Sequence, residues 1–226
     1  MNLRLPFLIL LTASTLMKAA PPDLRTVVEA FDRTQAEVQT FQAPFTLTIR
    51  RALLRTPTQM KGMVYLQGRD FVHFRFAPPE DLILHLTPKA LTSYSPQAGQ
   101  GQQIKIGLIR NTNRRFLGLG QRLSELADYF QAAVVEDPNS PTTWRIDLTP
   151  RALSVKRRFQ LLQIWMDRAQ HLPRQIVWVE RSGDRWELEL APPTLNQALP
   201  ASITGFKVPE GVPLRPEFDF FGSRKK

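Results

Sequence analysis

The tendency of apolar residues to recur at every second position between Lys61 and Pro96 constrains the fold of this chain more than any other feature. Turn-forming residues break the stretch into four short runs, and within the runs the apolar residues share one parity: Val64 and Leu66; Val72, Phe74 and Phe76; Leu82, Leu84 and Leu86. A period of two residues is that of a pleated strand with one apolar face. We therefore predict an antiparallel meander with one apolar face and one wetter face, and the wetter face includes His73 and His85.

The rest of the chain adds further strands and two helical patterns. Helical spacing predicts helices over residues 24–39 and 121–134, and the composition of residues 95–103 is that of a loop. Two-residue alternation predicts strands over residues 41–49, 144–150, 162–166, 176–179 and 186–190. Neither an internal repeat nor a βαβ alternation occurs. The pattern therefore predicts an α+β fold, in which helices pack on one side of a large curved antiparallel sheet or across its opening.

The N-terminus has the composition of an export signal. Within residues 1–20, Arg4 precedes a short apolar core, and Ala19-Ala20 precede Pro21. We predict cleavage after Ala20, which leaves residues 21–226 as a single exported domain with a short basic C-terminal tail; an uncleaved membrane anchor is the alternative. The chain contains no cysteine, which excludes a disulfide framework, a zinc–thiolate site and a cysteine nucleophile.

No group of residues argues for catalysis. His73 and His85 lie on neighbouring predicted strands near Glu80 and Asp81, and these four would be the candidates if the protein were an enzyme. Their spacing matches no known metal site, so we interpret both histidines as surface residues. The sequence also lacks a nucleophile elbow and a glycine-rich phosphate loop. We predict that the protein is not an enzyme and needs neither metal nor cofactor.

The formal net charge is +10, and basic residues gather in three clusters. The clusters are Arg110 with Arg114 and Arg115, Lys156-Arg157-Arg158, and Arg224-Lys225-Lys226. They form either a docking surface for an acidic partner or an anionic membrane, or simply solvated charge. Nucleic acid is not an expected partner, because the chain carries an export signal and no nucleic-acid-binding module.

Aromatic residues are concentrated in the predicted strands, including all four tryptophans: Trp144, Trp165, Trp178 and Trp186. They form either a packed core or the wall of a cavity for an alkyl-bearing ligand. Each methylene that moves from water into such a cavity contributes about 0.8 kcal/mol. A site of this kind needs a wide apolar lining and few polar groups.

Motifs spread over nearly the whole mature chain resemble one family, the periplasmic lipoprotein carriers of the LolA type. The motifs are Phe41-x-Ala43-x-Phe45 after the first helix; Gly62-x-Val64-Tyr65-Leu66, Phe74-Arg75-Phe76 with Pro79, and Lys89-x-Leu91-x-x-Tyr94-x-Pro96 in the centre; and Leu148-Thr149-Pro150, Gly183-Asp184 and Phe206-x-Val208-Pro209-x-Gly211-Val212 towards the end. Each motif is weak alone, and their order and spacing carry the resemblance.

The resemblance implies a half-open antiparallel β-barrel, a strongly curved sheet with helices forming a lid over an apolar cavity. A monomer of this kind would carry lipoprotein acyl chains or another lipid through the periplasm without a cofactor, from an inner-membrane ABC transporter to an outer-membrane receptor. The expected lining comprises Val64, Leu66, Val72, Phe74, Phe76, Leu84, Trp144 and Trp178.

The chain departs from the family pattern at the point that fastens the lid. The family places an arginine just before a proline at the end of the strand over residues 62–67, where this chain has Gly68 followed by Arg69. Arg69 is the candidate for lid control, although a shift of one residue reverses the face of a strand. The chain resembles a divergent member, and the alternative function is a lipid sensor or envelope adaptor that binds a protein partner.

Overall fold

The computed structural model describes residues 23–69, 71–105 and 122–216. The predicted signal peptide over residues 1–20, the cluster of Arg110, Arg114 and Arg115, and the tail from Arg224 to Lys226 lie outside the described residues.

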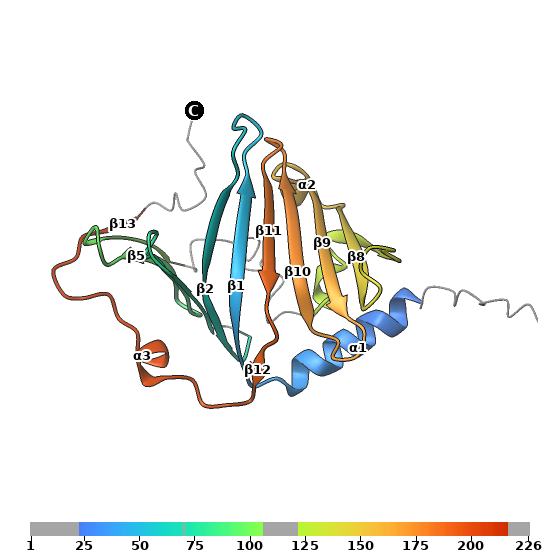
Figure 1. Cartoon of the computed structure of the whole chain (residues 1–226), viewed down its shortest axis with the longest axis horizontal. Coiled ribbons are helices and arrows are strands. Elements are labelled where there is room, and N and C mark those ends of the chain that lie inside the picture. The colour runs from blue at the N-terminus through green and yellow to red at the C-terminus, as the bar shows by residue number, and fades with distance from the viewer. Residues whose placement is uncertain (1–22, 70, 106–121, 217–226) are drawn as a thin grey trace, which may run out of the picture.

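The described residues form one curved sheet (Figure 1). Its strands are β1 Thr40–Arg50, β2 Thr58–Gln67, β3 Phe71–Phe76, β4 Ile83–Leu86, β5 Ala90–Ser95, β6 Gln100–Lys105, β7 Phe130–Val135, β8 Thr143–Pro150, β9 Phe159–Asp167, β10 Pro173–Glu180, β11 Arg185–Leu190, β12 Thr194–Leu195 and β13 Leu214–Arg215. The helices are α1 Leu24–Glu37, the 3₁₀ turn η3 Ser124–Leu126, α2 Leu153–Lys156 and α3 Ala201–Thr204.

Neighbouring strands follow the order β13-β6-β5-β4-β3-β2-β1-β11-β10-β9-β8-β7, and β12 pairs with β1. All these pairs are antiparallel except β13 with β6. The two edge strands, β13 and β7, do not pair with each other in the part of the chain that the structure describes. The sheet is therefore half-open, which confirms the predicted fold class.

One face of the sheet is apolar along most of its width, and we call it the inner face. Strand register aligns Leu47 with Met60 on one side and with Leu188 on the other. The same row continues through Ile176 to Ile164 of β9. These side chains bury one another without a second sheet, because the curvature of a single sheet lets distant strands share one core. The outer face of β1 and β11 carries threonine and glutamate instead, as the alternation predicts.

Helix α1 packs against the same core, and it crosses one end of the sheet near β12 (Figure 1). Val27 and Phe31, one turn apart, are fully buried in the inner-face cluster. The Asp32 carboxylate accepts hydrogen bonds from the backbone N–H groups of Leu123 and Ser124, at 2.7 and 3.3 Å. These bonds attach η3 to α1, so the two elements form one covering unit, which we call the lid segment.

The helix predicted over residues 121–134 is wrong. Among residues 122–134 only η3 is helical, and Phe130, Ala132 and Val134 lie on strand β7, opposite alternate residues of β8. Their spacing fits both periods, and β-branched residues at positions 134 and 135 favour the strand once β8 offers a partner.

The loop predicted over residues 95–103 is confirmed only over residues 96–99, because Ser95 ends β5 and Gln100 to Lys105 form strand β6 beside it. The Gln103 side chain donates a hydrogen bond to Thr92 Oγ1 across the pair, at 3.0 Å. A glutamine-rich, apolar-poor strand has no alternation for a sequence pattern to detect.

The wetter face predicted for the meander, with His73 and His85 at the surface, is wrong over β3 to β5. His73 is 1% exposed and His85 is 9% exposed. The segment that follows α3 lies over this outer face, and the Phe206 ring contacts both imidazoles with ring centroids 5.2 and 5.1 Å apart. A residue more than one hundred positions away in the chain therefore buries a face that looks polar in its own strands.

Candidate functional site

The eight residues expected to line a lipid cavity all lie on the inner face. Val64 faces Phe74, and Phe74 faces Leu84, in register across β2, β3 and β4. On the other half of the sheet the Trp178 ring stacks on that of Trp186, with centroids 5.7 Å apart. Seven of the eight are buried, and Trp144, near the edge, is half-buried against His171. Their role in binding lipid stays a prediction.

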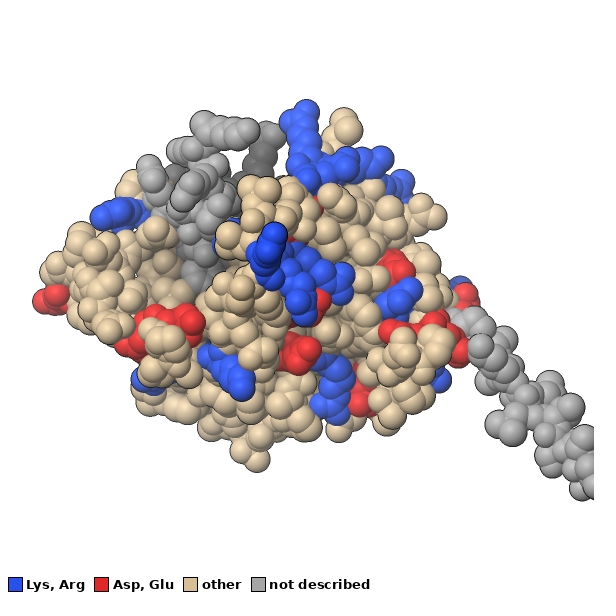
Figure 2. Space-filling model, turned by 45° about the horizontal axis from the view of Figure 1, so that its top comes forward, with Lys and Arg blue, Asp and Glu red and all other residues tan. Residues whose placement is uncertain are grey.

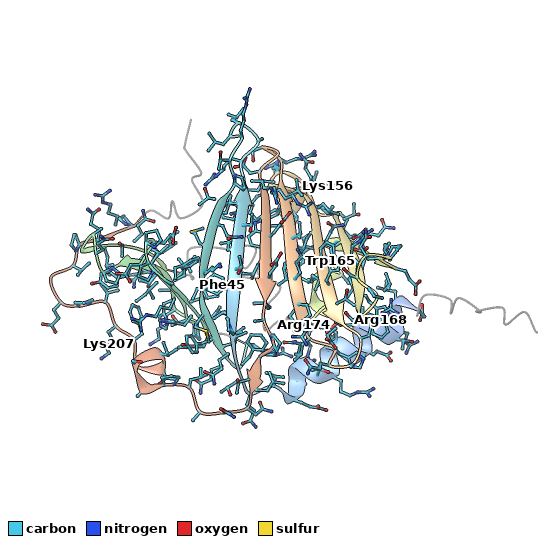
Figure 3. The ribbon with its side chains drawn as sticks, viewed as in Figure 1. Phe45, Lys156, Trp165, Arg168, Arg174 and Lys207 are labelled. Atoms are coloured by element: carbon cyan, nitrogen blue, oxygen red, sulfur yellow. The ribbon has the colours of Figure 1, made fainter. Side chains whose placement is uncertain are left out.

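Phe45 is the aromatic residue at the centre of this face, and the list above missed it (Figure 3). Its ring meets those of Phe74 and Phe76 edge to face, with centroids 5.2 and 5.0 Å apart. Gly62 faces Phe45 in the strand register, and a Cβ added there would collide with the Arg75 carbonyl oxygen and crowd the Phe45 ring. The alternation of apolar residues in β1 is the signal that could have found Phe45.

The lid segment closes one side of the inner face. Leu123 and Leu126 join Val27 and Phe31 in the apolar cluster, so the segment covers the sheet with apolar side chains. The lining residues therefore pack against one another and against the lid.

Arg69 lies in the turn between β2 and β3 and binds the lid segment. Its Nη1 atom lies 3.0 Å from the Glu125 Oε1 atom on η3. Gly68, just before it, has a φ of +56°, a left-handed conformation that favours glycine, and it donates a backbone hydrogen bond to Gln39. The turn therefore presents the guanidinium to the lid, although Arg69 follows the family position by one residue.

A separate cavity of about 770 Å³ lies on the outer face, between strands β4 to β6 and the C-terminal segment. Its lining includes none of the eight expected residues and comprises His85, Thr87, Lys89, Ala90, Thr92, Gln103, Lys105, Phe206, Lys207, Val208 and Leu214. Three lysines line it, and Figure 3 labels Lys207 beside the C-terminal segment. The sequence pattern could not predict this cavity, because its two walls come from segments far apart in the chain.

The two histidines form a buried pair beside this cavity, with their Nδ1 atoms 3.1 Å apart. For a hydrogen bond between them, one ring carries a proton on Nδ1 and donates it to the unprotonated Nδ1 of the other. Burial lowers the pKa of His73 to about 4, and the neighbouring His85 and Arg75 contribute in the same direction. Burial also lowers the pKa of His85. Burial therefore disfavours the charged form of both imidazoles.

The enzyme candidates do not converge on a catalytic or metal site. Glu80 and Asp81 are both half-buried in the connection between β3 and β4. Within residues 23–69, 71–105 and 122–216, no group of three or more histidine or acidic side chains is arranged to hold a metal ion. The same ranges contain no helix with the length and hydrophobicity needed to cross a bilayer.

Neither a protein-family model nor a curated protein matches the sequence. Solved structures do match. An uncharacterized conserved protein from Thermus thermophilus has a TM-score of 0.51 and 13% identity, over 84% of this chain and 96% of its own. At this identity the likeness shows the fold alone.

Other similar structures include the LolA superfamily protein NE2245 from Nitrosomonas europaea, with a TM-score of 0.43 and 12% identity over 82% of this chain and 98% of its own. A chain of the MucA/MucB complex of Pseudomonas aeruginosa has a TM-score of 0.38 and 16% identity, over 77% of this chain and 59% of its own. Structures similar to this chain thus include a LolA superfamily member at low identity, as the sequence resemblance implied.

Proposed function

We propose that the protein is a periplasmic carrier that binds the acyl chains of a lipoprotein on its inner face and moves them from the inner to the outer membrane. The observation that supports this most is the width of the apolar face, which runs in register from β4 through β1 to β8. Polar side chains are few on this face, as an alkyl guest requires. Because the face is already covered, cargo replaces contacts that the lid segment makes, which keeps its affinity moderate enough for release.

Uptake of an acyl chain tests the proposal. Delipidated protein is titrated with a fluorescent fatty acid and with a triacylated lipoprotein, and we expect a defined stoichiometry with each. A charge on the inner face, Leu84→Asp, is expected to abolish uptake, while Ile83→Asp, the neighbouring residue on the opposite face, retains it. Folded protein that takes up neither probe, or a Leu84→Asp variant that binds normally, would contradict the proposal.

The contact between Arg69 and Glu125 is expected to act as the latch of the lid. Both side chains are about half-exposed, and such ion pairs contribute about 0.2 to 1 kcal/mol. Arg69→Gln or Glu125→Gln should therefore speed acyl loading by up to about fivefold, and the double variant should add nothing to either single one. Stopped-flow fluorescence measures the rates.

The matched control for the latch is Arg25→Gln, because Arg25 is exposed and pairs with Glu29 at 2.8 Å within α1 itself. Its loading rate should equal that of the wild type. If the effects of Arg69→Gln and Glu125→Gln on the loading rate add in the double variant, the two residues act separately and the predicted latch is contradicted.

The second candidate function is an adaptor or lipid sensor that binds a protein of the envelope. The displaced arginine and the tight packing of the inner face favour it, because a closed core leaves little room for cargo. A pull-down from envelope extract that returns one protein partner, together with native mass spectrometry that finds no lipid on the purified protein, would support the adaptor over the carrier.

A further inference from the structure

Apolar and basic side chains meet at the end of the sheet opposite β12, where the β1–β2 hairpin, the β10–β11 turn and α2 lie (Figure 1). Three of the four exposed large apolar residues in the described part of the chain belong to this end. Leu53 is 96% exposed and Leu54 is 63% exposed at the hairpin tip, and Leu153 of α2 is 72% exposed. Single exposed leucines are ordinary, but three at one end of a molecule need an explanation.

Direct contacts join the three segments into one surface. Arg51 and the backbone N–H of Ala52 in the hairpin bind the Asp184 carboxylate of the β10–β11 turn, at 3.1 and 2.9 Å. Arg181 of that turn donates to the backbone carbonyl oxygens of Lys156 and Arg158, both at 2.8 Å. These contacts hold the leucine-bearing segments in place, so the exposure of the leucines belongs to an ordered surface.

The same end is strongly basic. Figure 2 shows Lys and Arg side chains gathered along the end of the sheet that comes forward. Arg55, Lys156 and Arg157 are exposed there and make no ion pair with an acidic residue of the described ranges. Two acids nearby are already engaged, since Asp184 binds Arg51 and Glu187 binds Arg185. The surface therefore presents unneutralised cations beside its leucines.

We propose that this end, comprising residues 52–57, 181–183 and 153–158, docks on a bilayer that contains anionic phospholipids. Leucines that project from separate tips can enter the interface while the arginines and lysine between them bind headgroup phosphates. A protein interface of the usual kind would instead bury a contiguous apolar centre inside a polar rim. Charge complementarity and the scattered leucines together favour the membrane surface. The proposal does not depend on whether the inner face carries lipid.

Vesicle binding tests the proposal with protein purified from its own envelope. We expect it to sediment with vesicles of phosphatidylglycerol and phosphatidylethanolamine, to bind phosphatidylcholine vesicles weakly, and to dissociate at high salt. Replacing Leu53, Leu54 and Leu153 together by serine should lower the partition coefficient about tenfold or more. Arg55→Gln with Lys156→Gln and Arg157→Gln should lower it about a hundredfold at low salt.

The outer-face cavity provides controls of equal chemistry. Replacing Lys89, Lys105 and Lys207 by glutamine removes the same charge elsewhere, and Leu214→Ser removes a leucine that is 40% exposed. Both should bind vesicles as the wild type does. Because all these side chains lie at the surface, urea midpoints should stay unchanged. If the control variants lose as much vesicle binding as the test variants, net charge alone explains the binding and the proposal is overturned.

The absence of native cysteine allows a direct measure of insertion. An environment-sensitive dye on Leu53→Cys should shift to the blue with anionic vesicles, and the same dye on Gln170→Cys, in the turn at the other end of β10, should not. No shift at either position, or an equal shift at both, would overturn the proposal. Cross-linking of the residue 53 label to one envelope protein, without vesicle binding, would assign the surface to a protein partner instead.

Discussion

Phe45→Ala is expected to lower the free energy of unfolding by about 3 to 5 kcal/mol, the range for an aromatic side chain removed from a packed core. Phe45 is 3% exposed and touches two further phenylalanine rings. Gly62 beneath it cannot fill the space, since it has no side chain and its strand is held by β1 and β3. Urea unfolding measures the loss.

Phe45→Leu is the matched control, because it retains most of the apolar volume and should cost clearly less. The Ala variant also reports on the site. If acyl chains occupy the inner face, a fatty acid at one hundred times its Kd should restore about 2.7 kcal/mol. If Phe45→Ala lowers the free energy of unfolding by less than about 1 kcal/mol, Phe45 is not at the centre of the core. If the fatty acid does not raise the free energy of unfolding of this variant, the result counts against a lipid site on the inner face.

Acidification from pH 7 to pH 4.5 is expected to cost about 2 kcal/mol of stability through His73 alone. The pKa of His73 is about 4 in the folded protein and has its ordinary value of 6.5 in the unfolded chain. The unfolded state therefore binds more protons in this window, and stability falls as the pH drops from 6.5 towards 4. His85, whose pKa burial also lowers, acts in the same direction.

Two other buried or charged groups bear on this prediction. Burial raises the pKa of Glu180, so this carboxyl favours the folded state as the pH falls and partly offsets the histidines. Arg75 adds to the cost of protonating His73. Urea unfolding at several pH values measures the balance, and His73→Gln should flatten the pH dependence. Equal slopes in the wild type and in His73→Gln would contradict the assignment.

Local alternation was enough to predict the meander, its apolar parity and the shared inner face of Val64, Phe74 and Leu84. A pleated strand places residues two apart on one face, so the sequence of each short run is enough to identify its apolar face. The first helix was predictable for the same kind of reason, since Val27 and Phe31 recur at helical spacing. Neither prediction needed to know which strands were neighbours.

Other features depend on partners that lie far away in the chain. Strand β7 forms because β8 pairs with it, His73 and His85 are buried because Phe206 covers them, and Arg69 meets Glu125 only when η3 packs on α1. The cluster of Leu53, Leu54 and Leu153 at one end likewise exists only in three dimensions. The sequence alone therefore determined the local period and the apolar face of each strand, because both arise from backbone geometry over a few residues. The tertiary structure decided which face is covered and which charges meet, because burial and ion pairing depend on neighbours that only folding brings together.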